Sequence, residues 1–131
     1  MGRTSDKAER LALTLLAAME RRSLPEAQAL LAPTFEMVFP GPARFTSLAE
    51  MAAAAKDRYR SIAKLVDEVE SFDSHGRRVV YVRGTLYGTN AHGVEFADVR
   101  FVDRFVVNDE SLERQDVWND LAESGVLTRR S

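Results

Sequence analysis

The stretch VVYVRGTLYGT, residues 79–89, alternates between two sets of side chains, and one set is entirely apolar or glycine. After a turn at Asn90–Gly93, the stretch FADVRFVDRFVV, residues 96–107, continues the alternation. Successive side chains of a strand point to opposite faces of a sheet, so a period of two predicts strands. The two stretches therefore predict an antiparallel hairpin with one apolar face.

Two more strands are expected on either side of this hairpin. Residues 64–72 and 112–118 also read as strands, and short turns at 73–76 and 108–111 connect them to the hairpin. Turns this short join antiparallel neighbours in chain order. The sequence thus predicts a meander of four strands.

Three helices are predicted before the meander. The first is expected over about 6–22, and the second is short and ends before Pro33. The third begins after Ser47, and apolar residues repeat at helical spacing up to Ile62. Each start pairs a side-chain acceptor with a glutamate three residues later, as in a helix cap: Asp6 and Glu9, Ser23 and Glu26, Ser47 and Glu50.

These elements predict an α+β fold. A short strand over 35–39 stands between the second and third helices, and a tail helix follows Asp120. Long strands curl, and three helices suffice to cover one face of such a sheet. We expect residues 1–131 to form one domain, a cone-shaped curled antiparallel sheet wrapped around three helices and enclosing a pocket.

Composition argues against several functions. The formal charge is -2 and basic residues are scattered, so we expect no nucleic-acid partner. The absence of cysteine excludes thiolate chemistry and suits a cytoplasmic protein, and the apolar run 11–19 is too short to span a membrane. His75 and His92 are isolated in turns and no phosphate-binding glycine loop occurs, so neither metal nor cofactor is expected.

The apolar faces of the two central strands are expected to form the pocket wall. Gly84 is expected to leave room there, because it has no side chain. A hydroxyl from Tyr59 on the third helix could reach a ligand. The other expected wall residues are Leu15, Val38, Met51, Ala55, Val82, Leu86, Phe101, Phe105 and Trp118.

Asp103 interrupts the apolar face between Phe101 and Phe105. An unpartnered ionised carboxylate in such a place costs several kcal/mol, so burial favours its protonated form. A protonated acid facing a dry pocket is a candidate catalytic group. The alternative is a structural carboxylate that is hydrogen-bonded to Tyr59 or to a backbone amide.

Two other carboxylates depend on strand orientation. Glu36 could act as a base if it pointed inward, although alternation favours Phe35, Met37 and Phe39 on the inner face. In the last strand the pattern does not choose between two faces. If Asp116 faces the pocket, it joins Asp103 in a two-carboxylate site, and Trp118 forms a wall; otherwise the inward set is Gln115, Val117 and Asn119.

The order of elements resembles the nuclear transport factor 2-like (NTF2-like) superfamily, which includes ketosteroid isomerases and SnoaL-like polyketide cyclases. Three stretches carry the likeness: FEMVFPG at 35–41, residues 80–88, and residues 99–120 with their closing VWND. The likeness is an architectural pattern across nearly the whole chain, and none of its motifs is specific to one activity.

The resemblance implies a role for Asp103, which falls where ketosteroid isomerases keep the protonated acid of the oxyanion hole. Their base would fall near Val38 and their tyrosine near Leu15, and neither residue can exchange a proton. The Asp-Arg-Asp cluster of related epoxide hydrolases is not matched either, since Asp98 and Arg100 face outward. What remains resembles the SnoaL-like cyclases, where one pocket aspartate works without metal or cofactor.

We therefore expect a cofactor-free isomerase, cyclase or dehydratase acting on an apolar, carbonyl-bearing, polyketide- or steroid-like molecule by acid–base catalysis. The alternative is a non-catalytic ligand-binding or dimerisation module. The outer sheet face carries Tyr81, Tyr87, Arg83 and Arg100, a composition typical of interfaces. A homodimer through that face is expected, as the resemblance also implies.

Overall fold

The elements follow the predicted order, with one strand added. The structure is a computed structural model that describes residues 6–130. Its helices are α1 (Lys7–Glu20), α2 (Leu24–Gln28), α3 (Leu48–Ala55) and α4 (Leu121–Ser124). Its strands are β1 (Leu31–Phe39), β2 (Ala43–Phe45), β3 (Tyr59–Ser74), β4 (Arg77–Asn90), β5 (Glu95–Asn108) and β6 (Ser111–Asn119). The α+β class is confirmed.

Two of the three predicted helix caps are present. The Asp6 carboxylate accepts a hydrogen bond from the Glu9 amide at 3.0 Å, and the Ser47 hydroxyl accepts one from the Glu50 amide at 3.2 Å. Ser23 caps α2 without a side-chain hydrogen bond. Within residues 6–130, no helix has the length and apolar character needed to cross a membrane.

The sheet is mixed rather than wholly antiparallel. Its strand order is β2-β1-β6-β5-β4-β3, and the predicted meander from β3 to β6 is antiparallel throughout. β1 joins β6 in parallel, with Met37 opposite Gln115. β2 pairs with β1 as a short hairpin after the turn near Gly41, and its three residues are too few to show a period of two.

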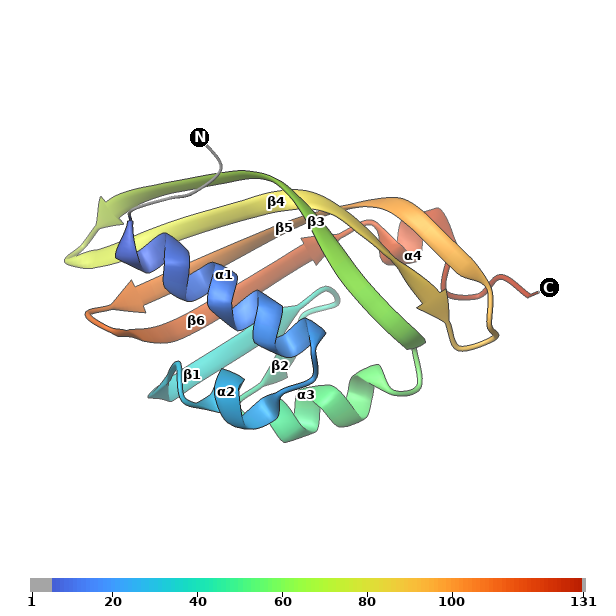
Figure 1. Cartoon of the computed structure of the whole chain (residues 1–131), viewed down its shortest axis with the longest axis horizontal. Helices are drawn as coiled ribbons and strands as arrows, with labels where there is room; N and C mark the ends of the chain where they lie inside the picture. Colours follow the sequence, from blue (N-terminus) through green and yellow to red (C-terminus); the bar gives the residue numbers. More distant parts are fainter. Residues whose placement is uncertain (1–5, 131) are drawn as a thin grey trace.

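Gly84 and Gly88 allow β3 to curl steeply over β4. A Cβ atom on Gly84 would lie 1.9 Å from the Leu65 carbonyl oxygen, and one on Gly88 would lie 2.1 Å from the Ser61 carbonyl oxygen. Figure 1 shows β3 crossing diagonally over its neighbours. The expectation that Gly84 leaves room for a ligand is therefore wrong, because backbone fills the space.

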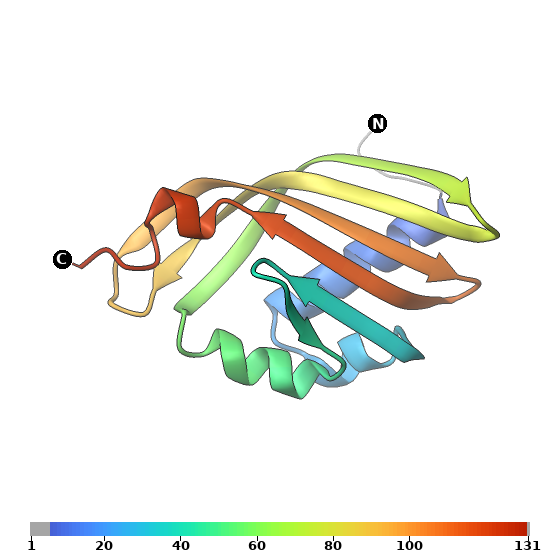
Figure 2. The ribbon, with the colours of Figure 1, turned by 180° about the vertical axis from the view of Figure 1, so that it is seen from behind.

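The core lies between the concave side of the sheet and α1. α1 buries one side against the strands through Ala8, Ala12, Leu15 and Ala18. Short alanine side chains allow the helix to approach the sheet closely. Figure 1 shows α1 lying across the concave side, and Figure 2 shows it behind the strands when the molecule is turned round.

α3 is shorter than predicted. The helix ends at Ala55, and Tyr59, placed on the helix by spacing alone, is instead the first residue of β3, opposite Asn90. Ile62 also belongs to β3 and lies opposite Gly88. Residues spaced by three satisfied the helical pattern, but aromatic and β-branched residues favour strands, and pairing with β4 fixes this segment.

Candidate functional site

A cavity of about 660 Å³ lies between the concave side of the sheet and the three helices α1–α3. Most of its wall is apolar. The apolar lining residues are Leu16, Met19, Leu24, Phe39, Ala49, Met51, Ala52, Ala53, Ala55, Ile62, Ala63, Leu86, Val117 and Leu121. Both its volume and its apolar character suit a small organic ligand.

A second, more open hollow of about 360 Å³ lies at the β3–β4 hairpin end of the molecule. Its lining includes Asp6 and Arg78, which form an ion pair with each other at 2.5 Å. Because these charges already satisfy one another and the hollow is shallow and polar, the larger cavity is the candidate site.

Only part of the expected wall borders the cavity. Met51, Ala55, Tyr59 and Leu86 line it, as expected. Leu15, Val82, Phe101 and Phe105 belong to the solid core and do not line it, because α1 packs directly onto the central strands. Val38 does not line it either, because it lies on the outer face of β1, opposite Asp116.

The orientation of β6 is now resolved. Gln115, Val117 and Asn119 line the cavity, and Trp118 lies on the opposite face with 52% of its surface exposed. Trp118 is therefore not a pocket wall. A shift in register between β5 and β6 near Val107 sets this orientation, which alternation alone could not reveal.

Asp116 does not join Asp103. It lies on the outer face, where it accepts hydrogen bonds from Arg114 at 2.9 Å and from Arg104 at 3.5 Å. The two-carboxylate site is therefore not formed. Glu36, the other alternative base, pairs with Arg44 at 3.1 Å and Arg114 at 2.9 Å and does not line the cavity.

Asp103 points inward and is completely buried. Its Oδ2 accepts a hydrogen bond from the Lys64 ammonium, whereas Oδ1 has no partner. Burial raises the pKa of Asp103, and the charge of Lys64 opposes that rise. The expected partner Tyr59 is thus replaced by Lys64, which lines the cavity while Asp103 lies behind it.

Lys64 is held from several directions. Its backbone N–H donates to the Glu20 carboxylate at 3.0 Å, which ties β3 to the end of α1. Its ammonium nitrogen lies 4.7 Å from the centre of the Phe101 ring, within range of a cation–π interaction. The ammonium is therefore fixed at the inner wall of the cavity.

Gln115 is the second polar group of the inner wall. It is 1% exposed, and neither its amide oxygen nor its amide nitrogen has a hydrogen-bond partner. The amide is near enough to lower the pKa of Asp103, as the smallest of the contributions, but the geometry is not that of a regular hydrogen bond. Unsatisfied buried amides are rare in native proteins, so this one is a candidate ligand contact.

Tyr59 lines the cavity from the start of β3. Burial raises the pKa of its hydroxyl, and the nearby charges of Arg58 and Arg22 oppose the rise. The hydroxyl therefore stays protonated at neutral pH and can donate a hydrogen bond to a ligand.

Lys64 and Gln115 were not singled out from the sequence. Alternation along β6 allowed two possible inward-facing sets of side chains, and Gln115 belonged to one of them. Lys64 stood at the first position of its predicted strand, and the register shift of β3 between Val66 and Glu68 hides its inward orientation. Only the pairing of β3 with β4 places Lys64 on the inner wall of the cavity, beside Gln115.

No protein-family model and no curated protein matches the chain. Solved structures do. TerC, co-crystallised with polyporic acid, superposes with a TM-score of 0.79 at 18% identity, covering 95% of this chain and 100% of TerC. An NTF2-like protein of unknown function from Burkholderia pseudomallei gives a TM-score of 0.76 at 20% identity, covering 95% and 99%.

A protein from Jannaschia described as a SnoaL-like polyketide cyclase gives a TM-score of 0.66 at 13% identity, covering 99% of this chain and 100% of its own. At such identities the similarity establishes the fold alone. The chain has the NTF2-like fold that its order of elements predicted.

Proposed function

We propose that the chain binds an apolar, carbonyl-bearing small molecule in this cavity and catalyses its isomerisation, cyclisation or dehydration without a cofactor. One observation carries the proposal. Lys64, in its ion pair with Asp103, and the unpartnered Gln115 amide stand together on the inner wall of a mostly apolar cavity. Fold neighbours support it, since TerC was crystallised with a small molecule and another neighbour is described as a polyketide cyclase.

The chemistry follows from these groups. A substrate carbonyl oxygen would accept hydrogen bonds from the Lys64 ammonium and the Gln115 amide N–H. When a proton leaves the carbon beside the carbonyl, negative charge develops on that oxygen, and fixed donors in a dry site stabilise it strongly. Asp103 Oδ1, which accepts no hydrogen bond within residues 6–130, would take the proton once the substrate reaches past the Lys64 ammonium, and a raised pKa makes a carboxylate a better base.

A non-catalytic ligand-binding protein is the second candidate. The complete burial of Asp103 behind Lys64 favours it, because a substrate must displace or pass the ammonium before reaching Oδ1. In that case the ion pair would only hold Lys64 in place for binding.

Deuterium exchange separates the two candidates. The purified chain is incubated in D₂O with a panel of steroid-like and polyketide-like ketones, and mass spectrometry follows exchange beside the carbonyl. We expect exchange above the buffer rate, falling by roughly 10²–10⁴-fold in Asp103→Asn and Lys64→Met variants, the range for loss of acid–base catalysis. Ketones that bind, by thermal shift, without faster exchange would favour the binding protein.

A further inference from the structure

Exposed basic side chains form the outer edge of the cavity, which we call its mouth. Elsewhere in residues 6–130, most lysines and arginines pair with carboxylates, as Arg83 does with Glu68 and Arg100 with Asp120. Within the same range, the basic residues that line the mouth are in no ion pair; they are Arg22, Lys56, Arg58 and Arg60. A chain of net charge -2 thus keeps an excess of positive charge at one opening.

Carboxylates do not neutralise this group. Among the residues that line the cavity, Glu20 is the only acidic one, and its carboxylate accepts the backbone N–H of Lys64. The positive charge acts on a residue of the cavity wall, since Arg58 and Arg22 both lower the pKa of the Tyr59 hydroxyl. An anion at the mouth would therefore meet four basic side chains that form no ion pair with residues 6–130.

Arg22 adopts a backbone conformation that is unfavourable for a residue with a side chain. It follows α1 with a φ of 60°, and its N–H bonds to the Met19 carbonyl while that of Ser23 bonds to the Ala18 carbonyl. This is the Schellman ending of a helix, in which glycine is the usual residue because side chains disfavour the left-handed conformation. Arginine here carries its guanidinium toward the opening instead.

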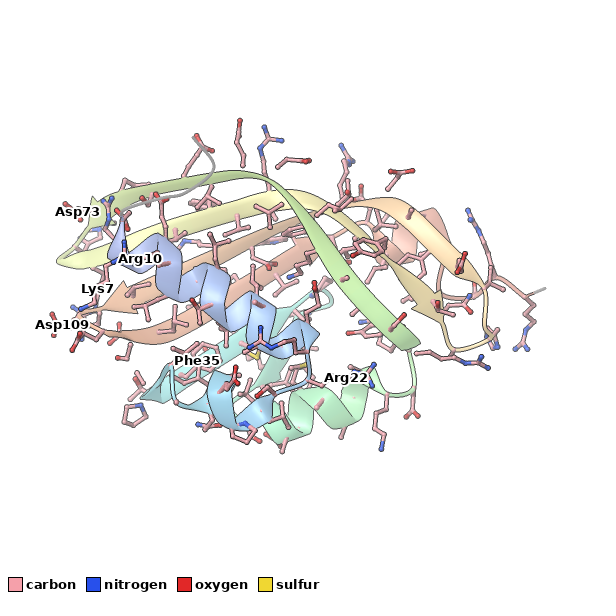
Figure 3. The ribbon with its side chains drawn as sticks, viewed as in Figure 1. Lys7, Arg10, Arg22, Phe35, Asp73 and Asp109 are labelled. Carbon is pink, nitrogen blue, oxygen red and sulfur yellow. The ribbon has the colours of Figure 1, made fainter. Side chains whose placement is uncertain are left out.

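That guanidinium is also fixed. Arg22 Nη2 donates a hydrogen bond to the Arg60 carbonyl at 2.5 Å, joining the end of α1 to the start of β3. Figure 3 shows Arg22 beside the beginning of β3. The Arg60 guanidinium itself lies next to Gly93 of the β4–β5 turn, so the cationic group spans several elements.

We propose that the ligand of this cavity carries a carboxylate, which Arg22, Lys56, Arg58 and Arg60 bind at the mouth. The apolar body of the ligand then extends inward, and its carbonyl meets Gln115 and Lys64. The inference rests on the proposed function and narrows its substrate class to acids. The buried, unpartnered Gln115 amide would then contact the far end of the same ligand.

The test uses two probes of equal shape, 2-naphthoate and 2-naphthamide, which differ in charge. Calorimetric titrations are run on the wild-type chain in low salt. We expect the carboxylate to bind roughly tenfold more tightly than the amide, in keeping with a few unit charges acting through water at short range. The preference should shrink as salt rises from about 10 mM to 500 mM, because exposed charges are screened.

Variants then locate the effect. In Arg58→Gln/Arg60→Gln we expect the preference to fall several-fold while the affinity for 2-naphthamide is unchanged. The control Arg83→Gln/Arg100→Gln removes the same charge from residues outside the cavity, and it should keep the preference. Thermal melts of both variants confirm folding before titration.

The outcomes separate the two proposals. The carboxylate inference is overturned if the wild type binds both probes equally. It is also overturned if the control variant loses as much of the preference for 2-naphthoate as Arg58→Gln/Arg60→Gln does. Either result leaves the proposed function standing. If neither probe binds, the carboxylate inference fails, and the exchange experiment on ketones decides the proposed function separately. Binding of acetate or inorganic phosphate as tightly as 2-naphthoate would also overturn it, because the apolar body would then contribute nothing.

Discussion

Lys64 on β3 and Asp103 on β5 form an ion pair over β4, the strand that separates them in the sheet. Lys64 lies opposite Leu86 and Asp103 lies opposite Val82, so the pair spans the position of Gly84 between them. Two residues that are distant in sequence are thus brought together by register.

Removing one partner of this ion pair should lower the stability of the fold. Asp103→Leu leaves the largely buried Lys64 ammonium without a counter-charge, and we expect the free energy of unfolding to fall by about 2–4 kcal/mol. The double variant Lys64→Met/Asp103→Leu should lose less than the single variant, since no charge remains buried. Urea denaturation measures both, and a double variant as unstable as the sum of the singles would contradict the coupling.

The free energy of unfolding of the wild type should depend on pH in the way expected for a buried acid. The folded-state pKa of Asp103 lies above the ordinary value of 3.8, so the native state binds the proton more tightly than the unfolded state. Its contribution to stability is then complete below about pH 3.8 and declines as pH rises through the raised pKa. Subtracting the Asp103→Asn stability curve from that of the wild type isolates this decline, and a flat or rising difference would contradict it.

Gln115→Leu should separate stability from ligand binding. The amide has no hydrogen-bond partner within residues 6–130, so leucine is expected to stabilise the free chain by about 1 kcal/mol. The same change removes the inner polar contact and should abolish the thermal shift caused by carbonyl-bearing ligands. Val117→Ala, which changes the neighbouring wall residue without removing a polar group, serves as the control. A destabilised variant would mean that Gln115 has a structural partner.

Gly84→Ala tests the curl of the sheet. The added methyl group would overlap the Leu65 carbonyl oxygen, which belongs to rigid backbone. We expect a loss of about 2–4 kcal/mol, at the upper end for backbone conflicts in a core. Thr85→Ala, on the other face of the same strand, should cost far less. Equal losses would show that β3 can move aside.

The outer face is expected to form a homodimer. Leu65, Phe72, Tyr87 and Trp118 are all exposed there, and Phe72 stacks on Tyr81 with ring centres 6.1 Å apart. Apolar and aromatic residues beside arginines are typical of interfaces. Light scattering at micromolar concentration should give twice the chain mass, and Trp118→Arg should halve it. A monomeric wild type would contradict the prediction.

Alternation predicted the central sheet well. The inner and outer faces of β4 and β5 agree with the alternation at 79–89 and 99–107, including the inward orientation of Asp103. A register shift before Val99 interrupts the alternation, so that Phe96 and Val99 are both buried. A period of two is a local property that each strand displays by itself. The helix caps at Asp6 and Ser47 were readable for the same reason.

The polar groups of the site were not predictable because they depend on register. A shift between Val66 and Glu68 in β3, and another at Glu113 in β6, set which residues face inward on strands β3 and β6. Neither shift leaves a mark in the pattern of apolar residues. The partner of Asp103 and the orientation of Gln115 therefore required the assembled sheet.

The parallel pairing of β1 with β6 has a consequence for biosynthesis. β6 lies between β1 and β5, so the sheet strand that is synthesised last joins β1 and β2 to the meander. Until the ribosome has released β6, β1 has no neighbour except the short β2, and the edge of β5 stays open. Contacts of such long sequence separation form slowly. The nascent chain therefore holds two unjoined parts of the sheet until β6 is available, and β6 then pairs with both of them.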